Sequence, residues 1–589
     1  MHNLMYVGSV LLAWSLWMFT SLVKNYWIAR KIGLPMVISP ATPLNPFWII
    51  CYRVFPQVLL LKHLPLGLGR WVRCTFMGWT FNDKYALHDE LGDLFAVVSP
   101  GAIEVIVADP QAAHAVLARR KDYIKPAVMY EQLNVFGPNL NSVEGEDWQR
   151  HRRLTAPSFN EKTSSLVWDE ASRQAQDMVA SWSRKASEGT KDTVGDTATL
   201  ALHVLTSAGF GVAYSFGQGV QSLSQGHAMT YKDSLSLCLQ NIITFSIFPK
   251  RFLSLKFLPS KLRTLGKAAH EFQRYMEETL AHERSSASDR QSGSGNLASA
   301  LVQASEDAKN SMEEGKKIKV GLSDDEIFGN IFAYNLAGHE TTANTVATAL
   351  VLLAAHPQYQ DWLTEEIDSV VGTSREAWQY EKAFPNLHRC LAVMVSNRFD
   401  KIPHVRRPLN SQHSVRNTAT LRLYSLHPKF TGSHHQEIMS RGRSFFLPPA
   451  TFVNINVQAL HTNPKTWGSD SLTWDPRRWI TRLASFKESS NMPSMPTEEA
   501  HVEPAKGTFI PWADGPRNCP GQKFAQVEFV SVMANLFSTH HVKPILSTGQ
   551  NSEDAKKALL DMVEGSAISA VTLQMQEPRK VALKWERRA

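Results

Sequence analysis

The stretch Trp512-Ala-Asp-Gly515-Pro-Arg517-Asn-Cys519-Pro-Gly521 places one cysteine between two glycines, with an arginine two positions before it. Glycines allow a tight loop whose backbone N–H groups point at the sulfur, and such N–H groups favour a thiolate over a thiol. Arg517 adds a fixed positive charge that suits a carboxylate on the same ligand. The pattern predicts that Cys519 binds a soft metal from one side. The alternative is a buried free cysteine, because cysteine packs like a small hydrophobe.

The longest helical pattern of the chain lies well before this loop. It begins with a capping box, because Glu326 follows Ser323 by three positions, and it ends at His356-Pro357. A second helix is predicted directly after Cys519, where apolar residues recur three or four positions apart. Strands are predicted at 96–99, 103–108 and 452–457, a hairpin around 576–578, and a surface loop at 285–295.

The run Ala337-Gly338-His-Glu340-Thr341-Thr lies in the middle of the long helix. A glycine, an acid and hydroxyls cost stability at mid-helix, which indicates a function for them. A threonine here can donate to an earlier carbonyl and loosen the helix, which opens a groove beside a ligand. A carboxyl group beside an alcohol can relay protons, although a solvated helix face would carry the same residues.

Trp148 and Arg152 lie four positions apart in another helical segment and therefore share one face. A planar indole and a guanidinium together suit the edge of a large anionic ring. The alternative is an exposed basic turn of helix.

These stretches resemble, in the same order, the motifs of the cytochrome P450 family. The Cys519 stretch is similar to Phe-x-x-Gly-x-Arg-x-Cys-x-Gly, with Trp512 in place of the phenylalanine. The resemblance implies the P450 fold, which is mainly α with small β-sheets. It also implies haem b as the cofactor, with Cys519 as the axial thiolate ligand of the iron. Gly515 and Gly521 would shape the loop, and Trp512 would cover the sulfur side of the ring.

The resemblance also assigns roles to the other motif residues. Residues expected to contact the haem propionates are Trp148, Arg152 and Arg517. Residues expected to handle oxygen are Ala337 and Gly338, which would leave room for O2, and Glu340 and Thr341, which would deliver protons.

One motif of the family is incomplete in this chain. Arg478, in Trp-Asp-Pro-Arg-Arg478-Trp, is the expected arginine of the family's Pro-Glu-Arg-Phe segment. The family's Glu-x-x-Arg corresponds to Ala419-Thr-Leu-Arg422, where alanine stands in place of glutamate. Without that carboxylate, the two arginines Arg422 and Arg478 repel, and breaking such a buried network costs roughly 3–5 kcal/mol.

Residues 395–418 separate this incomplete motif from the start of its helix near Pro385. The stretch contains Pro403 and Pro408 and has no hydrophobic period, and a loop of this size inside a core helix is unusual. We hypothesise an unspliced intron or an error in the gene structure, because Val395-Ser396 is what an in-frame splice donor commonly encodes. A mature transcript that contains the stretch would refute this hypothesis.

Residues 4–23 carry no charge and are long enough to cross a bilayer as a helix. Lys24, Arg30 and Lys31 follow, which places the rest of the chain in the cytosol. The expected organisation is a transmembrane anchor at 1–24, a proline-containing hinge at 25–49 and one catalytic domain at 50–589, interrupted at 395–418. The expected location is the endoplasmic reticulum membrane, with a single pass. A cleavable signal peptide is the alternative.

The composition is that of an ordinary globular protein, with 43% hydrophobic and 20% charged residues. Five cysteines without paired spacing indicate reduced thiols. The net charge is +8, but no Lys/Arg run is interleaved with aromatic residues. We therefore expect no nucleic-acid partner, and instead a membrane surface or an acidic protein.

The resemblance implies a monooxygenase that inserts one oxygen atom from O2 into a lipophilic small molecule, in a setting such as secondary metabolism. NADPH would supply electrons through a separate reductase, with cytochrome b5 as an additional donor, because no flavin- or nicotinamide-binding segment is visible. Substrate is expected to meet residues 128–136, Tyr334 and the segment after Leu426, and the apolar run 242–257 is expected to lean on membrane lipid.

Two alternatives stay open. One is a haem-thiolate isomerase or dehydratase that needs no reductase. The other is a non-catalytic member that fails to hold haem because of Ala419.

Overall fold

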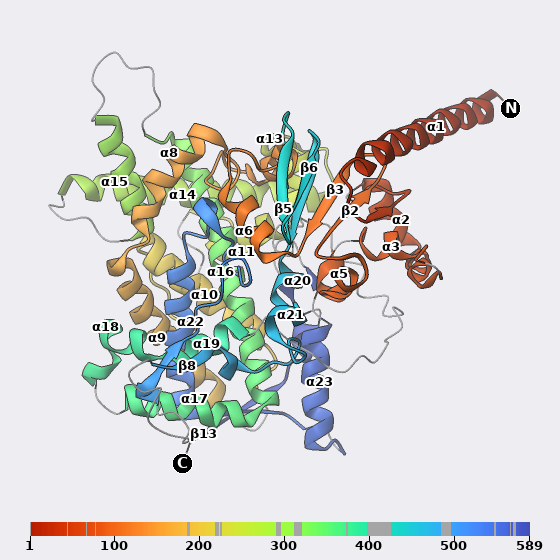
Figure 1. Cartoon of the computed structure of the whole chain (residues 1–589). Helices are drawn as coiled ribbons and strands as arrows, with labels where there is room; N and C mark the ends of the chain where they lie inside the picture. Colours follow the sequence, from red (N-terminus) through yellow and green to blue (C-terminus); the bar gives the residue numbers. More distant parts are fainter. Residues whose placement is uncertain are drawn as a thin grey trace.

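The computed structural model describes most of the chain. The described residues are 2–43, 45–65, 67–76, 78–184, 189–217, 223, 226–289, 296–310, 321–372, 375–396, 426–483, 496–546, 549–565, 567–568, 573–575 and 577–588. Helices form the body of the molecule, and the strands of residues 94–107 and 436–447 lie beside it toward the N-terminal helix (Figure 1). The prediction of a mainly α fold with small β-sheets is confirmed.

The longest helix, α16 (Asp324–Ala355), passes through the helical body. Its capping box is present, because the Ser323 side chain accepts from the N–H of Glu326 while the Glu326 carboxylate accepts from the N–H of Ser323. It ends before Pro357, since the residue preceding a proline is disfavoured in helical conformation. The predicted start and end of this helix are therefore confirmed.

The other long helices surround α16. They are α8 (Gly145–Thr155), α9 (Glu161–Arg184), α10 (Thr193–Phe210), α11 (Tyr231–Gln240), α14 (Ser260–Asp289), α15 (Leu297–Asn310), α17 (Pro357–Val370), α19 (His388–Ser396), α22 (Gln522–Thr539) and α23 (Ser552–Glu564). The loop predicted at 285–295 is partly helical, because α14 continues to Asp289; residues 290–295 lie outside the described part.

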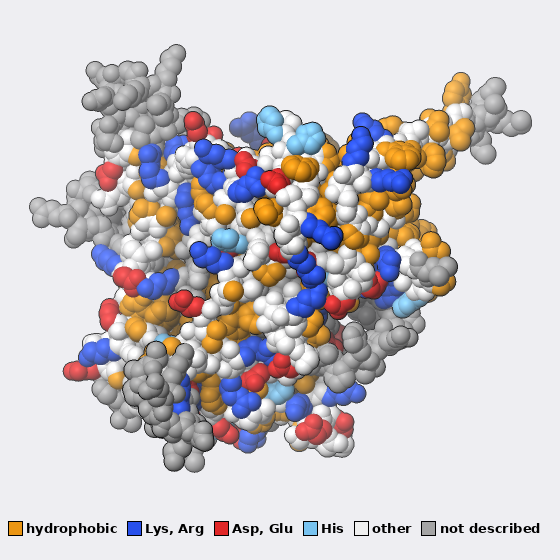
Figure 2. All heavy atoms as spheres, in the orientation of Figure 1, with side chains coloured by type: hydrophobic (Ala, Val, Ile, Leu, Met, Phe, Trp, Pro, Cys, Tyr) orange, Lys and Arg blue, Asp and Glu red, His pale blue; other side chains and the backbone are white. Residues whose placement is uncertain are grey.

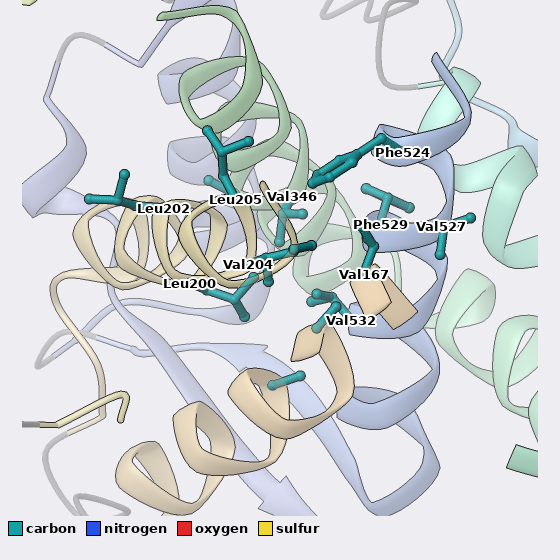
Figure 3. Packing of buried hydrophobic residues seen from close by; sticks show 14 of the residues in the cluster. Val167, Leu200, Leu202, Val204, Leu205, Val346, Phe524, Val527, Phe529 and Val532 are labelled. Atoms are coloured by element: carbon teal, nitrogen blue, oxygen red, sulfur yellow. The ribbon is translucent and has the colours of Figure 1, made fainter. Parts of the chain in front are cut away.

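The main core forms where α9, α10, α16 and α22 meet (Figure 3). Val167 of α9, Leu200 and Val204 of α10, and Val346 of α16 are all buried. Phe529 of α22 is buried with them. This packing fixes α22, which follows Cys519, against α9 and α16.

The largest sheet has the strand order β1-β2-β3-β7-β4. Its strands are β1 (Met36–Ile38), β2 (Leu94–Val98), β3 (Ile103–Val107), β4 (Leu426–Phe430) and β7 (Thr451–Asn456). The antiparallel pairing of β2 with β3 confirms the predicted strands around Pro100-Gly101, and β7 confirms the strand predicted at 452–457. The sheet brings β7, far along the chain, next to β3, and β4 pairs with the other side of β7.

Four two-stranded sheets complete the fold. They pair β5 (Gln436–Ser440) with β6 (Arg443–Leu447), β8 (Ile480–Arg482) with β9 (Glu499–His501), β10 (His540–Pro544) with β13 (Leu583–Arg587), and β11 (Ala567–Ile568) with β12 (Leu573–Gln574). The hairpin predicted around 576–578 is wrong, because β12 and β13 on its two sides pair with β11 and β10 instead. A 3-10 turn at Pro578–Lys580 precedes β13.

The N-terminal helix α1 (His2–Arg30) projects from the body, and its last turns dock on the large sheet (Figure 1). Asn25 donates to the carbonyl of Ser99 at 2.9 Å, and Ala29 is buried. Residues 25–49, predicted as a hinge, include the end of α1, the strand β1 and the start of α2 (Pro46–Val54).

Hydrophobic side chains gather on the surface of α1 and of the adjoining segments α2 and η1 (Pro56–His63) (Figure 2). Among the residues described, no helix combines the length and the mean hydropathy of a membrane span. The anchor predicted at 4–23 is therefore not confirmed, since Trp14, Trp17 and Thr20 dilute its apolar residues. The side chains of residues 1–5 and 7 lie outside the described part.

Candidate active site

A cavity of about 330 Å³ lies between α8, α16, the strand β4 and the loop that holds Cys519. Most of the predicted site residues line it together. These are Trp148, Arg152, Ala337, Gly338, Thr341, Trp512, Arg517, Cys519 and Gly521. Of the described residues in the predicted set, Glu340, Gly515 and Arg478 do not line this cavity.

The Cys519 loop is tightly bent, as its glycines predict. Gly515 has a φ of +70°, and a Cβ there would lie 2.6 Å from the carbonyl oxygen of Leu117. A side chain at this position would therefore push the loop away from α6 (Pro110–Ala118). The N–H of Cys519 donates to the carbonyl of Trp512 at 2.9 Å, which closes the loop. Gly515 thus acts from outside the cavity by allowing the bend.

Opposing influences act on the Cys519 thiol. Burial raises its pKa, whereas a hydrogen bond from the backbone N–H of Gly521 and the positive charge of Arg152 act to lower it. Burial is the larger influence, so the net pKa is raised. As the sequence predicts, a backbone N–H group, that of Gly521, is directed at the sulfur. A bound metal cation would add the charge that favours the thiolate.

Trp148 and Arg152 lie on the face of α8 that borders the cavity. Arg152 donates to the backbone carbonyl of Asn518 at 3.1 Å and to its side-chain oxygen at 2.8 Å, next to Cys519. The guanidinium of Arg517 lies 4.6 Å from the ring centroid of Trp148 and donates to Glu144 at 2.5 Å. The indole and both guanidinium groups therefore stand at one edge of the cavity.

The middle of α16 forms the opposite wall. The Thr341 hydroxyl donates to the carbonyl of Ala337 at 2.6 Å, which is the back-bonding expected to loosen a helix. A Cβ on Gly338 would lie 3.1 Å from a methyl group of Leu205 in α10, so this glycine permits close packing behind the groove. Glu340 is half-buried on the same turn.

Two further cations, Lys125 and Lys429, line the cavity. The sequence motifs did not reveal them. Lys125 donates to the carbonyl and the side-chain oxygen of Asn141, at 2.8 and 2.5 Å. Lys429 lies in β4, and its exposed fraction is only 4%. No spacing in the sequence marks either lysine, because the sheet and the loop before α8 bring them to the site from distant segments.

Arg478 lies in a 3-10 turn, η6 (Pro476–Trp479), outside the cavity. Its guanidinium donates to the carbonyls of Asp470 and Thr473, at 3.2 and 3.1 Å. Its predicted partner Arg422, together with Ala419 and almost all of the predicted insert, lies outside the described residues.

The candidate site thus combines the Cys519 thiol, cations at one edge and, opposite, a helix turn with a back-bonded threonine. A comparison with known families agrees with this arrangement. A sequence model of the cytochrome P450 family matches residues 76–391 and 420–566. The matched segments cover well over half of the chain, which therefore belongs to the cytochrome P450 family. The match breaks at residues 392–419.

Similar proteins include several fungal enzymes. A cytochrome P450 monooxygenase of Arthrobotrys oligospora is 28% identical over 581 residues, covering 94% of both chains. One from Penicillium roqueforti is 29% identical over 596 residues, covering 98% of this chain and 97% of its own. The cytochrome P450 monooxygenase of the phomenoic acid biosynthesis cluster of Leptosphaeria maculans is 30% identical over 565 residues, with 90% of each covered.

Membership in this family makes the protein an oxygen-incorporating oxidoreductase whose cofactor is haem bound through a cysteine thiolate. The donor set fits that group. Cys519 supplies a sulfur that faces the cavity, and the cationic edge suits the two carboxylates of haem.

Proposed function

We propose that the protein inserts one oxygen atom from O2 into a lipophilic small molecule, with electrons delivered from NADPH by a separate flavoprotein reductase. The observation that carries this proposal is the placement of Cys519 across one cavity from the Ala337-to-Thr341 turn of α16. Thiolate-bound haem supplies the oxygen-activating chemistry at this position.

The chain's own residues hold the cofactor and manage protons. Cys519 would supply the thiolate that holds the haem iron, and Trp148, Arg152 and Arg517 would bind the propionates at the cationic edge. The Thr341 hydroxyl, which donates to Ala337, keeps its lone pairs free to accept a hydrogen bond from a group in the cavity.

Glu340 is the proposed source of the proton that Thr341 passes on. The two residues occupy adjacent positions on the loosened turn of α16. A carboxyl group next to a hydroxyl offers a short route for a proton from the half-buried helix surface to the cavity.

The substrate is proposed to contact Tyr130 and Leu133 before α8, Tyr334 of α16, and His427 and Pro428 of β4. All five line the cavity. Most of the remaining lining is aliphatic or aromatic, which suits an apolar molecule.

The setting is proposed to be secondary metabolism at the endoplasmic reticulum, with a cytosolic catalytic domain. The relative named for the phomenoic acid biosynthesis cluster supports the first part. The exposed apolar residues of α1, α2 and η1 support membrane contact by the N-terminal segment, which is proposed as a single-pass anchor. The segments α12 (Ile242–Ile247) and α13 (Lys250–Leu253) are proposed to lean on the same membrane.

Residues 395–418 are proposed to be absent from the mature protein. The break in the family match at 392–419 supports this proposal, because it coincides with the interruption of the sequence motif. The described strands and helices resume at β4, which begins four positions after Arg422.

A carbon monoxide difference spectrum of the reduced protein tests the function. We expect the band typical of thiolate-ligated haem in the wild type and its loss in Cys519→Ala. We also expect the wild type to form product only when O2, NADPH and a reductase are all supplied. A colourless wild type supplied with haem, or turnover that needs no NADPH, would contradict the proposal and favour the non-catalytic or the isomerase alternative.

A further inference from the structure

One face of the helix α6 lies directly along residues 507–515, which lead to the cysteine loop. A Cβ on Gly507 would lie 2.0 Å from the carbonyl oxygen of Pro110, at the start of the helix. A Cβ on Gly515 would lie 2.6 Å from the carbonyl oxygen of Leu117, near its end. Positions seven apart share one face of a helix, so this face is in close contact with the segment at both ends.

His114 lies on the same face of α6, four positions after Pro110 and three before Leu117. Its Nδ1 atom lies 2.6 Å from Oδ2 of Asp514. The other oxygen of this carboxylate, Oδ1, accepts from the backbone N–H of Gly515 at 2.6 Å. Asp514 belongs to the cavity lining, whereas His114 lies outside it. The imidazole therefore holds, from outside, a carboxylate that stands at the cavity wall.

The backbone of the loop is strained next to this contact. Ala513 has a φ of +60°, in the left-handed region where a Cβ atom crowds the backbone. Such a conformation persists only where the surrounding contacts hold it. The hydrogen bond from the N–H of Cys519 to Trp512 lies within the loop itself. The contact of His114 with Asp514 instead ties the loop to the body of the protein.

Two further side-chain contacts hold the loop, and both involve residues that are proposed to bind the propionates. Arg517 donates to Glu144 at 2.5 Å, and Arg152 donates to the side chain of Asn518 at 2.8 Å. His114 has no proposed contact with the cofactor. Its contribution to the loop can therefore be measured without altering a group that is proposed to bind haem.

We propose that His114 is a positioning residue, which acts through Asp514 to hold the loop in the conformation that presents the Cys519 sulfur to the cavity. The inference rests on the proposed role of Cys519 as the haem ligand. The imidazole restrains the carboxylate through a hydrogen bond, and it offsets a negative charge beside the cofactor site. The family motif Phe-x-x-Gly leaves the position of Asp514 open, so the motif does not identify this pair.

The experiment uses His114→Phe, which keeps a ring but has no donor, and His114→Asn, whose amide nitrogen takes the place of Nδ1. Asp514→Asn changes the other partner, and the double variant His114→Phe/Asp514→Asn removes the contact from both sides. Asp122→Asn is the matched control, because it breaks the exposed pair of Asp122 with Arg119, 2.8 Å apart, just beyond the same helix. All variants are made in the protein translated from the mature transcript.

The first measurement follows how long the reduced, carbon monoxide-bound protein keeps its thiolate-haem band at a raised temperature. We expect His114→Phe to lose the band about fivefold faster than the wild type, as for one hydrogen bond of a partly exposed pair. His114→Asn and Asp122→Asn keep the wild-type rate. In the Asp514→Asn background, His114→Phe causes no further change, because its partner is already altered.

The second measurement is the reduction potential of the haem-loaded proteins, which a loss of folding stability alone does not move. His114→Phe leaves the Asp514 carboxylate with less compensation, and a negative charge nearby favours ferric over ferrous iron, so the potential falls. Asp514→Asn removes that charge and shifts the potential in the opposite direction. Asp122→Asn leaves the potential unchanged.

If His114→Phe matches Asp122→Asn in both measurements while the wild type shows the thiolate-haem spectrum, the positioning role is refuted and the proposed function stands. An equal effect of His114→Phe with and without Asp514→Asn refutes it as well, because His114 then acts through another group. If His114→Phe does not fold, Asp514→Asn decides: a wild-type band lifetime and potential in that variant refute the role. A wild type without the spectrum refutes the proposed function, and the inference with it.

Discussion

Thr341 combines a structural and a chemical property in one side chain. Its hydroxyl donates to the carbonyl of Ala337 at 2.6 Å, and the same residue lines the cavity across from Cys519. A hydroxyl that donates within the helix can still accept from a ligand, so it can hold a proton donor in position. Thr345, one turn further on, makes the same type of bond to the carbonyl of Thr341 at 2.8 Å.

Replacing Thr341 by alanine removes the hydroxyl while leaving the haem ligand intact. We expect Thr341→Ala to keep its thiolate-haem spectrum but to form roughly tenfold less product per NADPH consumed, because proton delivery becomes inefficient. Product and NADPH are measured in the same reaction. Thr345→Ala is the control, because it also removes a threonine that donates to the helix backbone. If both variants lose the same amount of product per NADPH consumed, a special role for Thr341 is contradicted.

The helices α8 and α16, which carry most of the cavity, are joined by one buried ion pair. Arg150 of α8 donates to both oxygens of Glu326, at 2.9 and 2.6 Å. Glu326 also closes the capping box at the start of α16. One carboxylate therefore both caps the start of α16 and holds this helix against α8. It thereby sets the distance between the residues proposed to bind the propionates and the Thr341 turn.

The pH dependence of stability tests this link. Burial would raise the pKa of Glu326, but hydrogen bonds from Arg150 and from the N–H of Ser323 outweigh it and lower the pKa from 4.5 to about 2. The folded-state pKa lies below the unfolded one, so the stabilisation is complete above pH 4.5 and is lost as the pH falls toward 2.

We expect Glu326→Gln to lower the free energy of unfolding by about 3 kcal/mol near neutral pH, because it removes the buried charged partner of Arg150 and leaves only the exposed Asp147. The difference from the wild type should shrink as the pH falls below 4.5. Denaturant unfolding, monitored through the circular dichroism of the helices, measures both the free energy of unfolding and its change with pH. Glu376→Gln, at an exposed pair with Lys382, should show no such change, and a pH-independent difference for Glu326→Gln would contradict the explanation.

In the molecule as a whole, the matched segments of the P450 family surround residues 392–419. The helix α19, whose last residues fall within this stretch, and the strand β4 after it both border the cavity, through Met394 and Lys429 for example. A correct connection between these elements is therefore needed for the site itself. The family motif that residues 419–422 resemble has a glutamate where this chain has Ala419, and we propose that its loss deprives Arg422 and Arg478 of a shared carboxylate.

We predict that deleting residues 395–418 and introducing Ala419→Glu increases the haem content per protein several-fold. The physical reason is the restored buried network, whose loss costs roughly 3–5 kcal/mol. Haem content is measured by the pyridine haemochrome assay and compared with the full chain. The deletion with Ala419 retained is the matched control, and a full chain that already holds one haem per protein would contradict the prediction.

The spacing of the motifs predicted most of the residues that line the candidate site, because the chemistry requires particular residue types at fixed separations along one segment. The loop around Cys519, the pair Trp148 and Arg152 on one face, and the Ala337-to-Thr341 turn are all local patterns. Local sequence also set the bounds of α16, because a capping box defines its start and a proline defines its end. The failed hairpin near 576–578 shows the limit, because strand partners depend on segments far apart.

The sequence by itself therefore determined the family, and it predicted the cysteine and the helix turn that line one cavity. Only the tertiary structure decided which cations share the cavity and which of them already have acceptors. Lys429 comes from a strand and Lys125 from the loop before α8, and both reach the cavity only because the sheet and the loop pack there. Burial and hydrogen-bond satisfaction are properties of packed neighbours, and spacing along one segment does not encode them.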